Sequence, residues 1–282
     1  MREKGDFTAA ADRPLSVPSE YLTEERIQKG LNTVIVGRRV YSFNVLKSTN
    51  DYAFRLAEEG AEEGIVVVAE QQTAGRGRFG RTWYSPPRVG LWFSIMLRPE
   101  MAPWEAPRIT LVAALAAARS VCRVTGLPAV LKWPNDVLIN TRKACGILTE
   151  LSAEAERINF VVIGIGVNVN QIETDFPPDI RRGATSLRIE CGHTVSRLRL
   201  LQTLLAELES AYSQMMDAGF ASLRGDIKST SCLLNRMVSV RVKNRTYRGH
   251  VRDITEQGGL VVHCANGRTE HIIAGDVNLI DE

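Results

Sequence analysis

The sequence predicts an α+β protein in which a mixed β-sheet with flanking helices is followed by a small all-β module. Up to about residue 231 the sequence contains both apolar runs, as in strands, and amphipathic periods, as in helices, which is typical of a layered core. Beyond Cys232 the helical period stops and short strands with turn residues between them follow. We expect an irregular leader over residues 1–20, a large domain over 21–231 and a barrel-like module over 232–282.

The composition is that of a soluble globular protein. Of the 282 residues 44% are hydrophobic and 24% charged, which is enough to bury a core without disulfides. The formal net charge of +3 is too small to imply a general affinity for nucleic acid. The five scattered cysteines indicate reduced thiols and predict neither a disulfide framework nor a zinc site. Since no signal sequence or membrane-spanning run is found, we expect a cytoplasmic protein without membrane contact.

The first part of the large domain combines strands with helices. A helix is expected from Ser48 to just before Gly60, because Ser48 and Asp51 have the spacing of a capping box. Apolar runs bounded by turn residues indicate buried strands, and a periodic segment rich in Ala and Leu indicates a long helix. The other elements expected here are a short helix near Leu22, strands over 34–45, 64–71 and 90–98, and the long helix over 106–124.

Three strands are expected next, and the third of them has two different faces. Aliphatic side chains on one face predict packing, whereas glycine and asparagine on the other let a ligand or a backbone come close. The aliphatic residues are Ile163, Ile165, Val167 and Val169, and the small or polar ones are Gly164, Gly166, Asn168 and Asn170. The three strands cover residues 130–139, 143–152 and 158–170, with a turn at 140–142.

The rest of the chain changes from helices to strands. Asn266-Gly267 is the pair of residues that hairpin turns favour, so it predicts a hairpin in the C-terminal module. A polar loop over 171–186 is followed by helices over 196–216 and 221–228, and then by strands over 237–244, 245–254, 259–264 and 268–275.

The stretch "AGRGRFGRTW" (74–83) contains Gly75, Gly77 and Gly80 at the spacing of a dinucleotide-binding loop. Such a loop must open a helix, but Arg-Thr-Trp-Tyr-Ser-Pro-Pro follows Gly80 and makes a helix improbable. The companion motifs of a kinase glycine loop are also missing. What remains is a mobile loop in which glycines alternate with Arg76, Arg78 and Arg81, and this composition suits an anion clamp. A solvated basic turn is the alternative.

Four motifs occur along the large domain: "KSTND" (47–51), "EQQTAGRGRFGRTW" (70–83), "KWPNDVLINTRKACGIL" (132–148) and "IGIGVNVN" (163–170). Together they resemble biotin protein ligase, and the resemblance extends over about residues 22–280. Their order and separations match that family, as do "ATSL" (184–187) and the small C-terminal barrel. The arginine loop and Lys-Trp-Pro-Asn-Asp are highly specific in combination.

The resemblance implies the biotin/lipoate ligase catalytic fold with an SH3-like C-terminal barrel. It also implies a reaction in two steps: biotin and ATP give biotinyl-5′-AMP and pyrophosphate, and biotin then passes to one lysine of a biotin carboxyl carrier protein. Neither step needs an enzyme nucleophile, and the four histidines offer no convincing catalytic triad. Catalysis is therefore expected to depend on positioning and charge stabilisation.

The resemblance also assigns the site residues. Arg78 corresponds to the arginine that retains the intermediate, Lys143 to the lysine that holds the biotin carboxylate, and Asp136 aligns the carrier lysine or contacts the adenylate; these three are the expected catalytic residues. The expected biotin-binding residues are Ser48, Thr49, Asn50, Gln72, Arg76, Gly77, Arg78, Lys143, Gly164 and Gly166. Those expected to bind ATP or the adenylate are Arg76, Arg78, Arg81, Trp83, Lys132, Asn135, Asp136 and Asn168.

Several of these residues could instead have purely structural roles. Ser48 is also a good helix cap, and Lys143 could be a solvated lysine at the start of a strand. The turn at Pro134 could be an ordinary surface turn, and Trp83 could simply pack. Phe79 occupies a position that can be arginine in the family, which lowers the charge of the loop. Mg²⁺ is expected to be held mainly by the phosphates of ATP, so no metal-binding residue is named.

The partner expected from the resemblance is the biotin carboxyl carrier domain of acetyl-CoA carboxylase or of a related enzyme. Only about twenty irregular residues precede "YLTEERIQKGL", too few for a winged helix-turn-helix, so we expect the ligase-only form without specific DNA binding. Whether the chain forms a homodimer is left open. The rival hypotheses are a lipoate ligase, which lacks this arginine loop, and a non-catalytic binding module.

Overall fold

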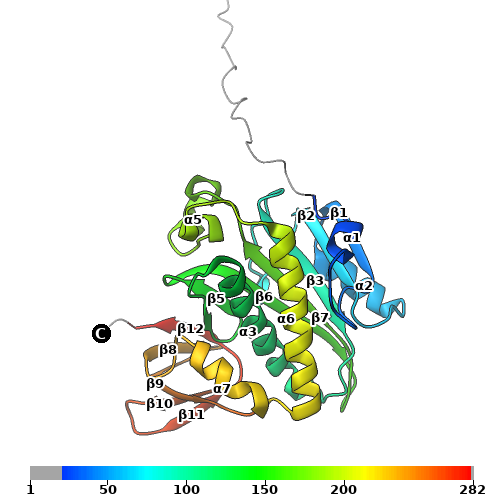
Figure 1. Ribbon diagram of the computed structural model, residues 1–282. Helices are drawn as coiled ribbons and strands as arrows, with labels where there is room; N and C mark the ends of the chain where they lie inside the picture. The colour runs from blue at the N-terminus through cyan, green and yellow to red at the C-terminus, as the bar shows by residue number, and fades with distance from the viewer. Residues whose placement is uncertain (1–20, 281–282) are drawn as a thin grey trace, which may run out of the picture.

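The computed structural model describes residues 21–280, and the predicted leader over 1–20 lies outside these described residues. A mixed seven-stranded sheet and an antiparallel five-stranded sheet form the framework, with the long helices packed beside them (Figure 1). The α+β fold class predicted from the sequence is confirmed, although the C-terminal sheet does not close into a barrel.

The large sheet has the order β1-β2-β3-β7-β6-β5-β4. Only β1 and β2 pair in parallel, and their crossover connection contains a helix, as a parallel pair requires. All other neighbouring strands are antiparallel. The strands are β1 (Val40–Leu46), β2 (Val66–Gln72), β3 (Gly90–Leu97), β4 (Val130–Lys132), β5 (Asp136–Ile139), β6 (Arg142–Ala153) and β7 (Ile158–Asn168).

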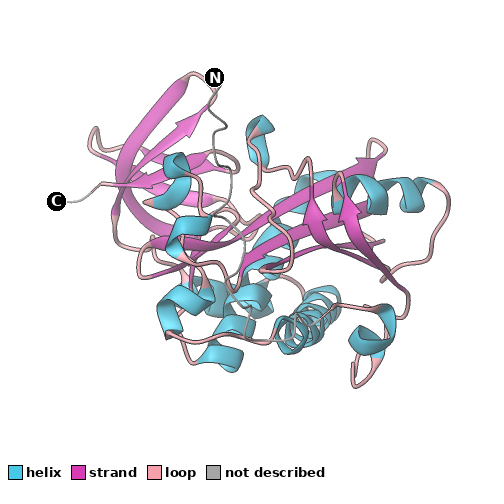
Figure 2. Cartoon of the chain, turned by 90° about the horizontal axis from the view of Figure 1, so that it is seen from above, coloured by secondary structure: helices cyan, strands magenta, loops and turns pink. Residues whose placement is uncertain are grey.

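Helices cover both faces of the large sheet (Figure 2). Alternate residues of β2 therefore enter different cores: Val66 and Val68 join the α3 and α6 side, whereas Val67 packs against α2. This two-sided burial explains the uninterrupted apolar run of β2. The helices are α1 (Glu24–Gln28), α2 (Thr49–Glu58), α3 (Ala106–Thr125), α4 (Pro178–Arg181), α5 (Leu187–Cys191), α6 (Arg197–Ala218) and α7 (Ala221–Thr230), with short 3₁₀ turns η1 (Arg78–Gly80), η2 (Pro103–Glu105) and η3 (Glu173–Asp175).

The C-terminal sheet packs against the large domain beside β4 and α7. Trp133 is buried and donates its indole Nε1–H to the carbonyl of Gly258 at 2.8 Å. Asp253 accepts from Arg224 at 3.0 Å and lies 2.9 Å from Lys228, both on α7. These contacts fix the second sheet at one end of the first. Its strands are β8 (Met237–Val242), β9 (Arg245–Ile254), β10 (Leu260–Cys264), β11 (Thr269–Ile272) and β12 (Asp276–Leu279), in the order β11-β10-β9-β8-β12.

Two predicted strands differ from those observed. The strand expected over 34–45 begins only at Val40, because residues 34–36 turn and donate their backbone N–H groups to the Glu209 carboxylate at 2.5 to 2.7 Å. The strand expected over 130–139 is a hairpin of β4 and β5, in which Lys132 pairs with Asp136. Pro134 has no N–H to offer a ladder, and the chain reverses there.

Several short helices and one short strand were not predicted from the sequence. The loop expected over 171–186 contains η3 and α4, and α5 follows directly after it. β12 was not predicted, because its four residues are too few to show a period. Both segments reach the main pocket of the protein.

Candidate active site

A pocket of about 580 Å³ lies where the two sheets meet. It receives residues from α2, the arginine loop (74–83), β4, β5, β6 and β7, and also from β8, β9 and β12 of the C-terminal sheet. Every site residue expected from the sequence lines it: Ser48, Thr49, Asn50, Gln72, Arg76, Gly77, Arg78, Arg81, Trp83, Lys132, Asn135, Asp136, Lys143, Gly164, Gly166 and Asn168. The sequence thus identified residues that are far apart in the chain and share one cavity.

The start of α2 presents buried, hydrogen-bonded polar groups to the pocket. Ser48 caps the helix by accepting from the backbone N–H of Asp51 at 3.4 Å. Thr49 donates through both its N–H and its hydroxyl to Gln72 Oε1, at 2.8 and 3.1 Å. Asn50 donates to Glu150 at 2.8 Å and accepts from the Ser94 hydroxyl at 2.6 Å. The start of α2 is therefore both a helix cap and part of the pocket wall. Ser48 can cap the helix and still contribute to a binding site.

The glycines of β7 leave room for two side chains of the pocket. A Cβ atom on Gly164 would lie 2.0 Å from Asn50 Oδ1, and one on Gly166 would lie 2.2 Å from Trp83 Nε1. Asn168 is buried and donates to the carbonyl of Thr185 at 3.0 Å. The glycine face thus admits Asn50 and Trp83, which themselves line the pocket beside the strand.

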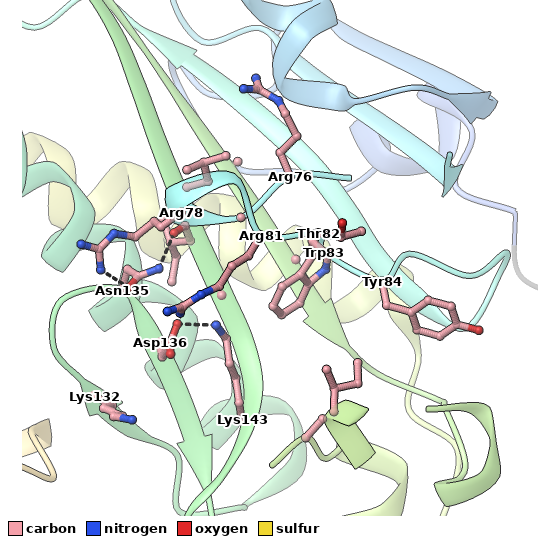
Figure 3. A pocket seen from close by; sticks show the side chains of 18 of the residues that line it. Arg76, Arg78, Arg81, Thr82, Trp83, Tyr84, Lys132, Asn135, Asp136 and Lys143 are labelled. Atoms are coloured by element: carbon pink, nitrogen blue, oxygen red, sulfur yellow. Dashed lines mark hydrogen bonds and ion pairs between the residues drawn. The ribbon is translucent and has the colours of Figure 1, made fainter. Parts of the chain in front are cut away.

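Arg76 points away from the other two arginines of the loop (Figure 3). Its guanidinium lies 2.5 Å from Asp51 and 2.7 Å from Glu150, and its side chain is 44% exposed. Burial alone would lower the pKa of Arg76, but the hydrogen bonds and charges of the two carboxylates outweigh it and raise the pKa. Arg76 therefore fastens the start of the loop to α2 and β6.

Arg78 connects the loop to both sheets. Its Nη1 donates to Asn135 at 3.0 Å (Figure 3). Its Nη2 donates to the carbonyl of Gly275 at 3.3 Å. Burial lowers the pKa of Arg78, although the charges of Asp276 and Asp136 oppose this, and an arginine remains cationic in either case. The charge is therefore held inside the pocket at a fixed place.

Arg81 contacts the C-terminal sheet, whereas Phe79 is exposed at the tip of the loop's 3₁₀ turn. Arg81 donates to Asp276 at 2.5 Å, and the same carboxylate lies 3.3 Å from Arg241. Phe79 adopts a positive φ of 57° and is 68% exposed, with the Arg78 guanidinium 4.7 Å from its ring centre. The loop is thus bound at its end to the C-terminal sheet.

Lys143 and Asp136 form an ion pair within the pocket. Lys143 Nζ lies 2.6 Å from Asp136 Oδ1, an atom shielded from solvent, and 5.2 Å from the centre of the Trp83 ring. Asn135 is anchored by donating to the carbonyl of Ile147 at 2.8 Å. Lys132, on the other side of the same turn, has no ion-pair partner within residues 21–280. Asp136 is therefore not part of an ordinary surface turn, and Lys143 is not simply a solvated lysine at the start of a strand.

The backbone of Lys143 is paired on both of its polar groups. Its N–H donates to Gly183 and its carbonyl accepts from Thr185, at 2.8 and 2.9 Å. The Glu190 carboxylate accepts hydrogen bonds from the Thr185 hydroxyl, Asn140 and Arg142, and its side chain is only 5% exposed. This carboxylate holds together the segments on either side of Lys143. Its role could not be predicted from the sequence, because the contacts come from two separate loops.

Replacement of Glu190 by glutamine should destabilise the protein by about 1 to 3 kcal/mol at neutral pH, since Arg142 and its neighbours lose a charged acceptor. Burial would raise the pKa of Glu190, but hydrogen bonds from Thr185 and Asn140 and the charge of Arg142 lower it. Such a group stabilises the fold above its unfolded pKa and loses this effect as pH falls through the folded pKa. Urea unfolding should therefore show a wild-type advantage at pH 7 that shrinks below about pH 4. A difference independent of pH would contradict the assignment.

Several lining residues were missed by sequence reasoning. Apart from Ala184, which belongs to the "ATSL" stretch, they carry no local signal, because they reach the pocket only through tertiary packing. From the C-terminal sheet these are Ser239, Arg241, Thr246, Asp276, Val277 and Asn278, and from the segment after β7 they are Phe176, Asp179, Ile180, Gly183 and Ala184. Within residues 21–280 no cluster of metal-ligating side chains occurs, and no helix there is long and apolar enough to cross a membrane.

Comparison with known proteins gives concordant matches. The model of the Biotin/lipoate A/B protein ligase family matches residues 42–168, and that of the Biotin protein ligase C terminal domain matches residues 233–279. The bifunctional ligase/repressor BirA of Bacillus subtilis is 38% identical over 258 residues, which cover 92% of this chain and 79% of that protein. The biotin–[acetyl-CoA-carboxylase] ligase of Mycobacterium tuberculosis is 37% identical over 82% of this chain and 85% of that protein.

A solved structure is similar over nearly the same extent. Biotin protein ligase from Aquifex aeolicus in complex with biotin and ATP has a TM-score of 0.75 and 30% identity to this chain. The match covers 87% of this chain and 100% of the other.

Proposed function

Because the chain belongs to the biotin protein ligase family, we infer that it activates biotin with ATP and then biotinylates a carrier protein. In the first step a carboxylate oxygen of biotin attacks the α-phosphorus, the bond to the pyrophosphate group breaks, and biotinyl-5′-AMP forms. In the second step the ε-amine of a carrier lysine attacks the carbonyl carbon of this mixed anhydride, and AMP leaves.

The observation that carries this function is the distribution of charge along the pocket. One end presents the neutral hydrogen-bonding groups of Thr49 and Asn50, which suit the ureido ring of biotin. The charge of Arg76 at this end is already paired with Asp51 and Glu150. The other end gathers Arg78, Lys132 and Lys143, which suits a carboxylate and phosphates. A cavity with this polarity fits a molecule that is neutral at one end and anionic at the other.

In this proposal the cations promote the first step. Lys143 binds the biotin carboxylate and then the developing charge at the α-phosphate, and Lys132 binds the outgoing phosphates. Arg78 retains the adenylate through guanidinium hydrogen bonds. Mg²⁺ is held by the phosphates of ATP and neutralises part of their charge.

In the second step Asp136 aligns the carrier lysine. Its carboxylate stands at the turn between β4 and β5, 2.6 Å from Lys143, and can accept a hydrogen bond from an entering amine. Because the anhydride is already activated, correct placement of the amine is the main requirement. The partner is proposed to be the carrier domain of acetyl-CoA carboxylase or of a related biotin-dependent enzyme.

Pyrophosphate release measured with ATP, Mg²⁺ and either biotin or lipoate tests the assignment. Release that depends on biotin is expected; release only with lipoate would identify a lipoate ligase, and no release with either would indicate a binding module. A salt-dependent shift of operator DNA by the purified protein would contradict the proposed ligase-only form.

A further inference from the structure

The hairpin formed by β8 and β9 is strongly basic. Between residues 241 and 248 the sequence reads RVKNRTYR, with four cations and no carboxylate. The whole chain has a net charge of only +3, so this charge is locally concentrated. We call the exposed side chains of Lys243, Arg245, Arg248 and Arg268 the basic face; Arg268 belongs to the neighbouring turn between β10 and β11.

The cations of the basic face are not used for folding. Arg76, Arg78 and Arg197 have hydrogen-bond or ion-pair partners within the chain. In the described part of the chain, by contrast, the side chains of Arg245, Arg248 and Arg268 have no such partner, and all three are exposed. Exposed cations that stabilise nothing within the protein are available for an external anion.

These cations converge on a second hollow of about 570 Å³. Arg245, Arg248 and Arg268 line it together with Tyr247, and Glu270 is the acidic residue among its lining. Guanidinium groups beside an aromatic ring are well suited to bind carboxylates of a protein surface.

Strand register connects this hollow with the candidate active site. Arg241 is paired with Thr246, and Ser239 is paired with Arg248, so these side chains share one face of the sheet. Ser239, Arg241 and Thr246 line the main pocket, and Thr246 also lines the second hollow. Arg248 therefore stands on the same face of the sheet as the pocket wall. Arg245 is paired with Val242 and leaves β9 on the other face, but it lines the same hollow, so the hollow adjoins the pocket through Thr246 and Arg248.

We propose that the basic face docks an acidic surface of the carrier domain whose lysine enters the pocket. This inference rests on the proposed ligase function, which requires a folded protein to bring an amine to the adenylate. Such a protein must cover the surface next to the pocket in every turnover, and that surface carries unpaired arginines. Charge complementarity beside a binding site mainly raises the association rate and selects the partner.

The test is a charge reversal, Arg245→Glu with Arg248→Glu, in the full chain. Biotinylation of the cognate carrier domain should show a KM about tenfold higher or more with little change in kcat, and added salt should raise the wild-type KM. Biotin-dependent ATP–pyrophosphate exchange should stay within twofold, because neither residue lines the main pocket. Arg252→Glu is the matched control: it is an exposed arginine on the same strand but outside both hollows, and its effect should be small.

A milder pair, Arg245→Gln with Arg248→Gln, should give an intermediate KM and guards against misfolding of the reversal variant. An unchanged carrier KM in both pairs overturns the docking proposal, and so does an equal effect of Arg252→Glu. Binding of duplex DNA that the reversal abolishes, with the carrier KM unaltered, overturns it in favour of a nucleic acid partner. Absence of pyrophosphate exchange in the wild type would instead refute the ligase function itself.

Discussion

Arg78→Gly is expected to release biotinyl-5′-AMP into solution while the adenylate continues to form. The guanidinium donates to Asn135 and to the Gly275 carbonyl, so its charge is held in place before any anion binds. A hydrogen bond from a charged group contributes about 1.5 to 3 kcal/mol, and losing it should speed dissociation of the adenylate roughly 10- to 150-fold. Glycine also removes the contact with Gly275, whereas the contact of Arg81 with Asp276 still connects the loop to the C-terminal sheet.

Nonspecific biotinylation of a bystander protein measures the released adenylate. Arg88→Gly is a suitable control, because Arg88 has a positive φ of 64° that glycine adopts freely and it does not line the pocket. Arg78→Gly should label the bystander strongly, whereas Arg88→Gly should resemble the wild type. Equal retention in both variants would show that Arg78 does not hold the intermediate.

The sequence was sufficient for those parts of the site that are encoded locally. The Ser48 cap, the arginine loop and the Lys132 to Asp136 turn each follow from a few adjacent residues. Ser48, the turn and, among the loop glycines, Gly77 line the observed pocket. The family, the fold class and the ligase function expected from these motifs are confirmed by the comparisons. Local chemistry and turn residues thus specify the site wherever neighbours in sequence act together.

Other parts of the site depend on contacts that no short pattern contains. Asp276 pairs with Arg81 and Arg241, which are distant in sequence, and lies on a strand too short to be recognised. Glu190 acts through Asn140, Arg142 and Thr185 from two loops. Such contacts arise only when the second sheet and the loops have packed against the first, so they require the tertiary structure.

Arg76 and Arg78 belong to one motif but have different partners in the structure, which the motif alone could not predict. These two arginines, like Arg81, were expected to contact biotin or the adenylate. Arg76 lines the pocket and is also paired with Asp51 and Glu150, which its motif does not indicate. We therefore expect Arg78 to contribute more to retention of the adenylate than Arg76, whose carboxylate partners already neutralise it.

Lys143→Ala should lower the rate of adenylate formation by about 10²- to 10³-fold, the usual effect of removing one group that stabilises a developing anion. The KM for biotin should rise as well, because Lys143 is proposed to bind its carboxylate. Initial rates of biotin-dependent pyrophosphate release measure both effects. Lys47→Ala is the matched control, since Lys47 is exposed, adjoins Ser48 and does not line the pocket; its rate should equal that of the wild type.

The ion pair between Lys143 and Asp136 makes a second comparison necessary. Without the lysine, a shielded carboxylate oxygen of Asp136 loses its cation 2.6 Å away and faces the substrate anions. Part of the loss in Lys143→Ala would then be repulsion by Asp136, and Asp136→Asn in the same chain should recover that part. Full recovery would show that Lys143 only neutralises Asp136. A residual loss of about 10²-fold or more in the double variant is expected, because the ammonium itself stabilises the developing charge at the α-phosphate.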